Sequence, residues 1–405
     1  MENNIKIAVL GLGYVGLPVL IKLKKSFKCI GYDINQKRIS QLKKRIDHNN
    51  TFSKKELINT KLTNKINDIK HCNIFIICVP TPINKNKKPD MSKLKNACIE
   101  IAKVIKINDI VVFESTYSPF TTNVFCKNII EKKSNLKAEK DFFLGYSPER
   151  INPGDKKNNI DKVTKVISAN SDLALHKIKM IYKKITKKIF IAKSIEIAES
   201  AKIIENIQRD ISIAFFNQLT EVFLKLKLNP NEIFKAAATK WNFIKLKPGL
   251  VGGHCIPVDP YYFYDFLKKK KINSNFILSG RNVNENYKKL IIKIIKKIFS
   301  RNNYKKILFL GATYKKNVPD FRNSKAIEII NFFKNKINCK VFDPYHLNDK
   351  FYIKLEIIKK FNNSNCLIIK LVDHDLFKSR KFKNLFIKKE IIDINNLEKI
   401  YKNYV

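Results

Sequence analysis

The first 33 residues constrain the fold of this chain more than any other segment. An apolar run, IKIAVL, leads into GLGYVG, a segment with helical spacing follows to about Phe27, and a second apolar run, CIGYD, ends in an acid. Apolar runs separated by a glycine turn and a helix are typical of the start of a β-α-β unit. Further apolar runs at 72–79 and 110–113 alternate with Lys-rich helical stretches, which favours a parallel sheet covered on both faces.

The glycine turn and the acid indicate a bound dinucleotide. Gly11, Gly13 and Gly16 have the GxGxxG spacing, at which backbone amides and a helix N-terminus can approach a pyrophosphate. Asp33 ends the second run, where a carboxylate can accept both ribose hydroxyls of NAD and would repel the 2′-phosphate of NADP. A glycine turn in a domain without ligand is the alternative, but strand, turn, helix and acid together favour NAD as the cofactor.

The rest of the chain indicates a second domain of the same kind. A single helical pattern extends from about Ser194 to Leu228, is longer than most globular helices, and is expected to bridge two domains. Near Lys305 the sequence KKILFLGATYKKN repeats the strand, glycine and tyrosine of the opening, and KVFDPY predicts a later strand. The predicted fold is α/β, with two Rossmann-like doubly wound domains joined by a long central helix. We expect an NAD-binding domain over 1–190, a central helical dimerisation domain with a cysteine loop over 191–295, and the second Rossmann-like domain over 296–405.

The charge of the chain raises a different class of function. The sequence has 80 Lys and Arg against 35 Asp and Glu, a formal net charge of +45, and so basic a surface attracts polyanions at low salt. A basic nucleic-acid-binding protein built on a Rossmann scaffold is therefore an alternative. The lysines are scattered along the whole chain, however, and no helix-turn-helix, RNP or zinc signature occurs. We expect no specific nucleic-acid partner.

Cysteine spacing and hydropathy bear on the cellular compartment. The eight cysteines lie far apart, most of them in apolar runs, and form no CxxC pair, which is typical of reduced thiols and predicts no metal site. The N-terminus lacks the pattern of a secretory signal, and no apolar run approaches the roughly 20 residues needed to span a bilayer. We expect a cytoplasmic protein without membrane attachment.

Motifs along nearly the whole chain occur in the order found in one enzyme family. They are GLGYVGLP, VPTP, ESTYSP, GYSPERINPGD, AKIIEN, GGHCIPVDPYY and GATYKKNVPDFRNS. The sequence thus resembles the UDP-glucose/GDP-mannose dehydrogenase family. SPERINPGD followed by KPGLVGGHC is most similar to its UDP-N-acetylglucosamine and UDP-N-acetylgalactosamine 6-dehydrogenases, which make uronic acids for surface polysaccharides such as Vi and O antigens.

The resemblance implies an activity and partners. The expected reaction is the NAD-dependent four-electron oxidation of the C6 hydroxyl of a UDP-N-acetylhexosamine, GlcNAc or GalNAc, to a uronic acid. The C-terminal domain is expected to bind the UDP-sugar, and the chain to form a homodimer or higher homo-oligomer. UDP-glucose and UDP-N-acetylmannosamine are alternative substrates, and a decayed enzyme that binds ligands without turnover is a further alternative.

A four-electron oxidation needs two hydride transfers, and the aldehyde between them must not escape. A thiolate can add to the aldehyde, the thiohemiacetal can release the second hydride, and water can cleave the resulting thioester. Cys255 is the candidate nucleophile, with a buried structural cysteine as the alternative, and Asp259 can position a water or a basic partner. His254 could be a metal ligand or catalytic partner, but neighbours on an extended chain point opposite ways, which favours a packing role.

Further catalytic residues are identified by the resemblance. Lys202 and Asn206 are four residues apart on the predicted helix and share a face, and the resemblance implies that they stabilise an oxyanion at C6. It also implies that Glu149 acts on the thioester through water, and that Thr116 helps to hold this water, although a lone hydroxyl can equally be a cap. The UDP-glucose branch has a second glutamate where this chain has Pro153, so the hydrolytic machinery of that branch cannot be transferred whole.

The remaining expected contacts involve the nucleotides. The stretch 245–253 has the Pro and Gly content of a mobile loop, which the family places against the nucleotide sugar. Lys315 is expected to contact the substrate, Arg322 to reach the cofactor across a domain or subunit boundary, and Arg281 to meet a phosphate. Other implied cofactor contacts are Tyr14, Val15, Arg38, Pro80, Thr81 and Thr116, and other implied substrate contacts are Glu149, Arg150, Lys202, Asn206, Gly249 and Gly252.

Overall fold

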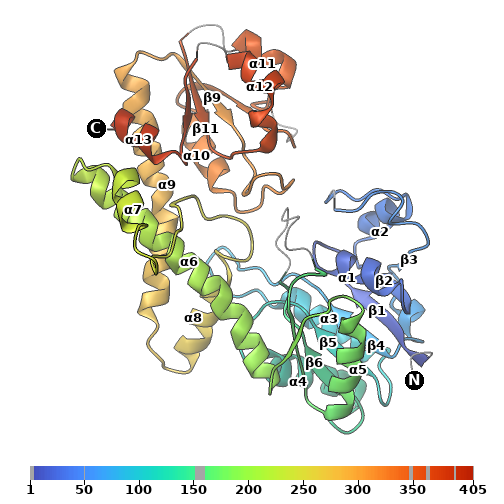
Figure 1. Cartoon of the computed structure of the whole chain (residues 1–405). Helices are drawn as coiled ribbons and strands as arrows, with labels where there is room; N and C mark the ends of the chain where they lie inside the picture. Colours follow the sequence, from blue (N-terminus) through green and yellow to red (C-terminus); the bar gives the residue numbers. More distant parts are fainter. Residues whose placement is uncertain are drawn as a thin grey trace. The chain divides into compact units, whose positions relative to one another are not determined.

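The computed structural model describes residues 4–49, 51–150, 160–345, 350–361, 365–386 and 389–404. The backbone divides into two compact units (Figure 1). Unit 1 comprises Met1–Glu205 and Tyr261–Asn273, and unit 2 comprises Asn206–Pro260 and Ser274–Val405.

Unit 1 contains an eight-stranded sheet with the strand order β3-β2-β1-β4-β5-β6-β7-β8. Every neighbouring pair is parallel except β6 and β7, which are antiparallel. The first six strands have the order of a dinucleotide-binding fold. The strands are β1 (Lys6–Leu10), β2 (Lys28–Tyr32), β3 (Lys61–Thr63), β4 (Ile74–Ile77), β5 (Ile110–Phe113), β6 (Phe143–Tyr146), β7 (Lys165–Ala169) and β8 (Ile189–Ile191).

Helices supply the rest of the core of unit 1. Every residue of β4 and β5 is buried, as expected for strands covered on both faces. Ile7, Ile76 and Val112 from the strands pack in one cluster with Leu20 of α1 and Ile178 of α5, and burial of each such side chain contributes about 1.5–3 kcal/mol. The helices are α1 (Gly16–Leu23), α2 (Gln36–Lys43), α3 (Ser92–Ala102), α4 (Lys127–Ser134), α5 (Asp172–Lys183) and most of α8 (Asp259–Lys269), and a π-helical segment (Thr121–Cys126) precedes α4.

The long helix that the sequence predicts is α6 (Ile195–Lys225), with 31 residues. It begins in unit 1 and ends in unit 2, as expected for a helix that links two domains. Beyond its end, Lys227 has a left-handed backbone, and Asn229 caps α7 (Pro230–Ala237) by accepting a hydrogen bond from the amide of Asn231. Proline at the first position of α7 starts this new helix without loss of an intrahelical hydrogen bond.

Unit 2 contains a four-stranded parallel sheet with the order β10-β9-β11-β12. Along β9, Ile307 and Phe309 pack in one apolar cluster, whereas Leu308 and Leu310 pack in another, because successive side chains of a strand face opposite sides. The sheet is therefore covered on both faces. The strands are β9 (Lys306–Leu310), β10 (Asn338–Phe342), β11 (Cys366–Lys370) and β12 (Ile391–Asp393), and the helices are α9 (Asn275–Arg301), α10 (Lys325–Lys334), α11 (Leu355–Phe361), α12 (Arg380–Lys383) and α13 (Leu397–Tyr404).

The two sheets share one local device after their first strand. Gly11 follows β1 with φ +88, and Gly311 follows β9 with φ +84. The amide after each glycine donates to a carboxylate at the end of the neighbouring strand, Asp33 at 2.8 Å in unit 1 and Asp343 at 2.6 Å in unit 2. This correspondence supports the prediction of a second Rossmann-like start, and the two-sheet α/β fold is confirmed.

Candidate active site

The glycine turn of unit 1 leaves room for a ligand at one position. A Cβ at Gly11 would lie 2.9 Å from the carbonyl oxygen of Cys78, and a Cβ at Gly16 would lie 2.0 Å from that of Gly11. A Cβ at Gly13 would meet nothing within 4 Å. Since α1 begins at Gly16, the open space at Gly13 lies where a pyrophosphate can approach a helix N-terminus. Tyr14 and Val15 lie in the same turn.

The acid that should bind ribose is held in place by backbone amides. Asp33 accepts hydrogen bonds from the amide of Leu12 at 2.8 Å and from that of Asn35 at 2.9 Å, one on each carboxylate oxygen. Each oxygen can accept a second bond, so the carboxylate retains capacity for two ribose hydroxyls. Arg38 donates to the carbonyl of Leu12 at 2.9 Å and to buried Asp47 at 2.9 Å. Arg38 therefore stabilises the glycine turn. The turn and the Asp33 carboxylate together fit NAD.

Segments after β4 and β5 meet at the carboxyl edge of the same sheet. The hydroxyl of Thr81 donates to the carbonyl of Thr116 at 2.5 Å, and that of Ser115 donates to the carbonyl of Val79 at 2.5 Å. Carboxyl ends of parallel strands share one edge, so the structure brings Pro80, Thr81 and Thr116 to the edge that also holds the glycine turn.

Lys202 and Glu149 are also joined in unit 1. The Lys202 ammonium donates to the backbone carbonyl of Glu149, and both residues are buried. Arg150 donates to the carbonyl of Thr164 at 2.9 Å and forms an ion pair with Glu205 on α6. The arginine that the sequence assigns to substrate is thus held by protein partners. Pro153, where the UDP-glucose branch has its second glutamate, lies outside the described residues.

Sequence reasoning missed Glu199, which ties α6 to the segment that carries Thr116. Its carboxyl group, with 0% exposure, accepts hydrogen bonds from the amide of Phe120 at 2.6 Å and from the amide and hydroxyl of Thr122 at 2.8 and 2.6 Å. Burial raises the pKa of Glu199 to about 8, because desolvation outweighs these hydrogen bonds. The only signal in the sequence is its place three residues before Lys202, on the same side of the helix.

The candidate nucleophile differs from the other cysteines in exposure. Six of the eight cysteines are buried, Cys29 is half-buried and Cys255 is exposed. The carbonyl of Cys255 accepts hydrogen bonds from the amides of Val258 and Asp259 at 3.0 and 2.9 Å, so a helical turn starts at the cysteine. The buried carboxylate of Asp259 accepts a hydrogen bond from the Asn206 side chain at 2.5 Å. The structure therefore joins Asn206, Asp259 and Cys255 within unit 2.

The extended chain expected at His254 is wrong, because Gly253 has φ +87 and the backbone bends into the turn that starts at Cys255. The His254 ring lies edge-on to Tyr314 at 6.1 Å, and its Nε2 lies 3.1 Å from Arg322, which pairs with Asp320 at 2.6 Å. Desolvation, and then the charge of Arg322, lower the pKa of His254, so the imidazole is neutral at neutral pH. These contacts indicate packing. Across the described ranges, no group of three or more His, Cys, Asp or Glu side chains is placed to bind a metal.

Unit 2 has a pocket of about 260 Å³ at the carboxyl edge of its sheet. Lys315 and Lys316 after β9 and Lys325 at the start of α10 line it, and Ser324 caps α10 by accepting a hydrogen bond from Ile327. Cations and a helix N-terminus attract phosphate groups. Of the residues predicted to contact substrate, Gly249, Gly252 and Lys315 line this pocket, whereas Glu149, Arg150, Lys202 and Asn206 do not. The other lining residues are Leu250, Thr313, Tyr314, Ala326, Leu371, Val372, Asp373 and Asn395.

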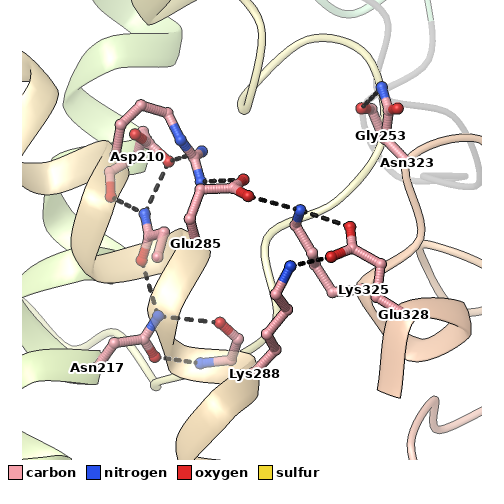
Figure 2. A network of polar contacts seen from close by, with 11 residues as sticks. Asp210, Asn217, Gly253, Glu285, Lys288, Asn323, Lys325 and Glu328 are labelled. Atoms are coloured by element: carbon pink, nitrogen blue, oxygen red, sulfur yellow. Dashed lines mark hydrogen bonds and ion pairs between the residues drawn. The ribbon is translucent and has the colours of Figure 1, made fainter. Parts of the chain in front are cut away.

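The loop on one side of this pocket is packed more closely than its composition suggests. A Cβ at Gly252 would lie 2.8 Å from the carbonyl of Asn323, and a Cβ at Gly253 would lie 2.8 Å from the Tyr314 ring. The Asn323 side chain donates to the carbonyl of Gly253 at 3.0 Å (Figure 2). The two glycines thus permit close approach to other parts of unit 2, and the loop expected to be mobile is anchored.

The prediction of a phosphate contact for Arg281 is wrong. Its side chain has 0% exposure and forms ion pairs with Asp210 at 2.6 Å and Glu285 at 3.2 Å. A guanidinium enclosed between two carboxylates compensates their charge, and nothing in the sequence indicates which of the eight arginines does so.

The dinucleotide-binding fold of unit 1, with its glycine turn and Asp33, is that of an NAD-dependent oxidoreductase, and unit 2 adds a pocket lined by three lysines. The comparisons make the assignment specific: the chain belongs to the UDP-glucose/GDP-mannose dehydrogenase family. Its residues 5–186 match the NAD-binding domain of that family, 196–286 the central domain, and 308–399 the UDP-binding domain. The predictions of family, enzyme class and NAD are confirmed.

Relatives cover most of the chain. Protein CapL of Staphylococcus aureus is 45% identical over 82% of this chain and 80% of its own length. A UDP-N-acetyl-D-glucosamine 6-dehydrogenase of Pseudomonas aeruginosa is 40% identical over 85% and 83%. The solved structure of the UDP-D-ManNAc dehydrogenase of Pyrococcus horikoshii has a TM-score of 0.86 at 29% identity and covers 97% of this chain and 96% of that one. Within the described segments, no helix has both the length and the hydropathy to cross a membrane.

Proposed function

We propose that this enzyme oxidises the C6 hydroxyl of a UDP-N-acetylhexosamine to a carboxylate, with UDP-N-acetylglucosamine as the preferred substrate and UDP-N-acetylgalactosamine as the alternative epimer. The preference rests on the UDP-N-acetyl-D-glucosamine 6-dehydrogenase among the relatives. The observation that carries the mechanism is the exposed Cys255 thiol at a turn fixed by Asp259, which in turn bonds Asn206.

The first half-reaction converts the alcohol to an aldehyde. NAD held by the glycine turn and Asp33 would supply a hydride acceptor, one NAD⁺ for each of the two oxidations. As the hydride leaves C6 and the hydroxyl proton is lost, negative charge develops on the oxygen, and Lys202 and Asn206 stabilise it. An ammonium has three N–H donors and a carboxamide two, so the bonds of Lys202 to Glu149 and of Asn206 to Asp259 leave donors for this oxygen.

The second half-reaction proceeds through sulfur. The Cys255 thiolate adds to the aldehyde carbon, and the new oxyanion takes a proton to give a thiohemiacetal. Loss of the second hydride and of the hydroxyl proton gives a thioester, and attack of water breaks the C–S bond to release the carboxylate and the thiol. Glu149 and Thr116 direct this water, and Asp259 orients Asn206 or a water. Each sugar consumes two NAD⁺ and one water and yields one carboxylate, two NADH and three protons, which pass to solvent.

We assign the binding residues as follows. Gly11, Gly13, Gly16 and Asp33 hold NAD, and the pocket that contains Lys315 and Lys325 holds the UDP moiety. Arg322 has a side-chain exposure of 56%, as a cofactor contact from another part of the assembly requires. Further assignments are Tyr14, Val15, Arg38, Pro80, Thr81 and Thr116 to NAD, and Glu149, Arg150, Lys202, Asn206, Gly249 and Gly252 to the UDP-sugar.

We further propose the three-domain division 1–190, 191–295 and 296–405, a homodimer, and a cytoplasmic location. Four apolar side chains on one face of α6 and a fifth directly after its end are exposed by 36–61%, which supports a helix-mediated dimer. All eight cysteines are free thiols, as in a reducing compartment. The five side chains are Ile197, Ile204, Phe215, Val222 and Leu226.

The experiment is a substrate panel. Purified enzyme with NAD is offered UDP-N-acetylglucosamine, UDP-N-acetylgalactosamine, UDP-N-acetylmannosamine and UDP-glucose, and NADH formation is followed by absorbance. We expect the highest kcat/KM with UDP-N-acetylglucosamine. A preference for UDP-N-acetylmannosamine or UDP-glucose would overturn the substrate assignment, and absence of NADH with all four would overturn the activity.

A further inference from the structure

The side chain of Asn217 on α6 forms hydrogen bonds with both backbone polar groups of Gly249, a residue of the pocket wall. Its side-chain oxygen accepts a hydrogen bond from the amide of Gly249 at 2.8 Å, and its side-chain nitrogen donates to the carbonyl of Gly249 at 3.1 Å (Figure 2). The Asn217 side chain has 1% exposure, whereas Gly249 is half-buried and lines the pocket, so the two hydrogen bonds link a buried side chain to the pocket wall.

A second asparagine fixes the orientation of Asn217. Asn284 on α9 uses its side-chain nitrogen to donate to the backbone carbonyl and the carboxylate of Asp210, at 2.8 and 2.7 Å. The side-chain oxygen of Asn284, which can only accept, therefore faces Asn217 and takes a hydrogen bond from its nitrogen at 2.8 Å. This leaves the oxygen of Asn217 for the amide of Gly249. Arg281 completes the buried array by its ion pair with Asp210.

The hydrogen bonds between Asn217 and Gly249 lie at one end of the loop that forms one side of the unit 2 pocket. Gly249, Leu250 and Gly252 line this pocket, and Asn323 bonds the other end of the loop at Gly253. Cys255 follows two residues later. In Figure 2 the loop passes between the side chains of Asn217 and Asn323, with the Lys325 ion pairs beside it. A change at Asn217 thus acts on the pocket wall without touching a ligand.

We propose that Asn217 is a positioning residue that sets the pocket wall for the UDP-sugar through the backbone of Gly249. The proposal rests on the proposed function, in which this pocket binds the UDP moiety. Asn217 itself contacts no reacting group. Asn217 holds the N–H and the carbonyl of Gly249 in position. Asn284 keeps the side-chain amide of Asn217 in the one orientation that can bond both of these groups.

The test compares two nearly isosteric changes on the same helix. Asn217→Leu removes both hydrogen bonds to Gly249. Thr220→Val removes a buried hydroxyl that donates to the carbonyl of Phe216 within α6 at 2.8 Å. UDP and NAD affinities are measured by calorimetry for each variant, and hydrogen–deuterium exchange is followed for the peptide that covers 246–253. KM and kcat are then measured with the best substrate of the panel.

We expect Asn217→Leu to weaken UDP binding and raise KM by about tenfold or more, to leave NAD affinity within about twofold, and to speed exchange of the loop peptide. Thr220→Val should leave all of these near wild type. The proposal is overturned if the two variants behave alike, or if loop exchange is unchanged in Asn217→Leu.

A second variant guards against failure to fold. Asn217→Ala removes both hydrogen bonds to Gly249 without adding bulk or charge, so it should also speed loop exchange and weaken UDP binding. Unchanged exchange in this variant would also overturn the proposal. If wild-type protein fails to bind UDP while the exchange results are as expected, the assignment of the pocket fails and the role of Asn217 in fixing the loop stands.

Discussion

At the residue scale, the chemistry depends on where one thiol lies relative to its neighbours. Cys255 is exposed, its carbonyl begins a helical turn, and Asp259 in the first turn of α8 orients the amide of Asn206. A carboxylate that accepts one N–H of a carboxamide fixes the direction of the other N–H. In the proposed mechanism, a short stretch of chain and one helix therefore supply the orienting acid, the oxyanion donor and the nucleophile.

Replacement of the nucleophile separates binding from turnover. Cys255→Ser should retain NAD and UDP-sugar affinity and lower kcat on the order of a thousandfold or more, because a hydroxyl is a far weaker nucleophile than a thiolate. Burial raises the pKa of Cys366 to about 11, so that thiol is neutral, and Cys366→Ser should retain turnover. Steady-state NADH formation checks both, and equal loss in the two variants would contradict the assignment.

Glu199 predicts a pH dependence of stability. Its folded pKa of about 8 lies above the ordinary value of 4.5, so the fold favours the protonated acid. This contribution to stability is full below pH 4.5 and is lost as pH rises toward 8, at about 1.4 kcal/mol for each unit of raised pKa. Glu199→Gln should remove this part of the dependence. Chemical unfolding of both proteins between pH 5 and 9 measures it, and parallel stability curves would refute it.

At the scale of elements, the glycine turns after β1 and β9 are similar, but the acids that they contact have different partners. In unit 1 the acid after β2, Asp33, is bonded by two amides and retains acceptor capacity. In unit 2 the corresponding acid, Asp343, also lies 3.2 Å from Nε2 of buried His374, which bonds Thr313 at 3.1 Å. A side chain thus takes the place at Asp343 that a ribose would need. This contact explains why only the first turn should bind a dinucleotide.

The glycines of the first turn should differ in effect. Gly13→Ala places a methyl group in open space, so the protein should fold with unchanged stability and bind NAD about tenfold or more weakly. Gly16→Ala would force a Cβ to 2.0 Å from the carbonyl of Gly11, so it should destabilise unit 1 itself. Thermal unfolding and NAD titration distinguish them. Unchanged NAD affinity in Gly13→Ala would contradict the assignment of the turn.

Local patterns explain which elements could be predicted. The glycine turn, Asp33 and the extent of α6 follow from spacing within a short window, and Lys202, Asn206 and Cys255 follow from motifs. The hydrogen bonds between Asn217 and Gly249 join residues that are 32 positions apart. In the sequence alone, Asn217 cannot be distinguished from a solvated asparagine, nor Gly249 from a loop glycine. Burial of Arg281 likewise depends on Asp210 and Glu285, which the fold brings next to it. The sequence around Arg281 therefore does not predict that it is buried.

At the scale of the whole molecule, one face of α6 is apolar and exposed within the single chain. Positions 197, 204, 215 and 222 recur at helical spacing on this face, and exposed Leu226 follows directly after the end of the helix. A chain with a net charge of +45 repels its own copies, so a dimer requires a specific apolar contact to offset that repulsion.

Charges placed on this face should separate the dimer. Phe215→Glu combined with Val222→Glu should shift the mass measured by light scattering from twice the chain mass of 47.2 kDa to that of one chain. Ile107→Glu, at an exposed residue that follows α3, should leave the dimer intact. A monomeric wild type, or a dimer that survives both glutamates, would refute the proposed interface.

The proposed four-electron oxidation is measured by the number of NADH molecules formed per sugar when UDP-N-acetylglucosamine is limiting and NAD is in excess. We expect two NADH for each sugar consumed, a uronic acid as the sole sugar product, and no free aldehyde trapped by a carbonyl reagent. One NADH per sugar with accumulation of aldehyde, or two NADH from a Cys255→Ser variant at the wild-type rate, would contradict it.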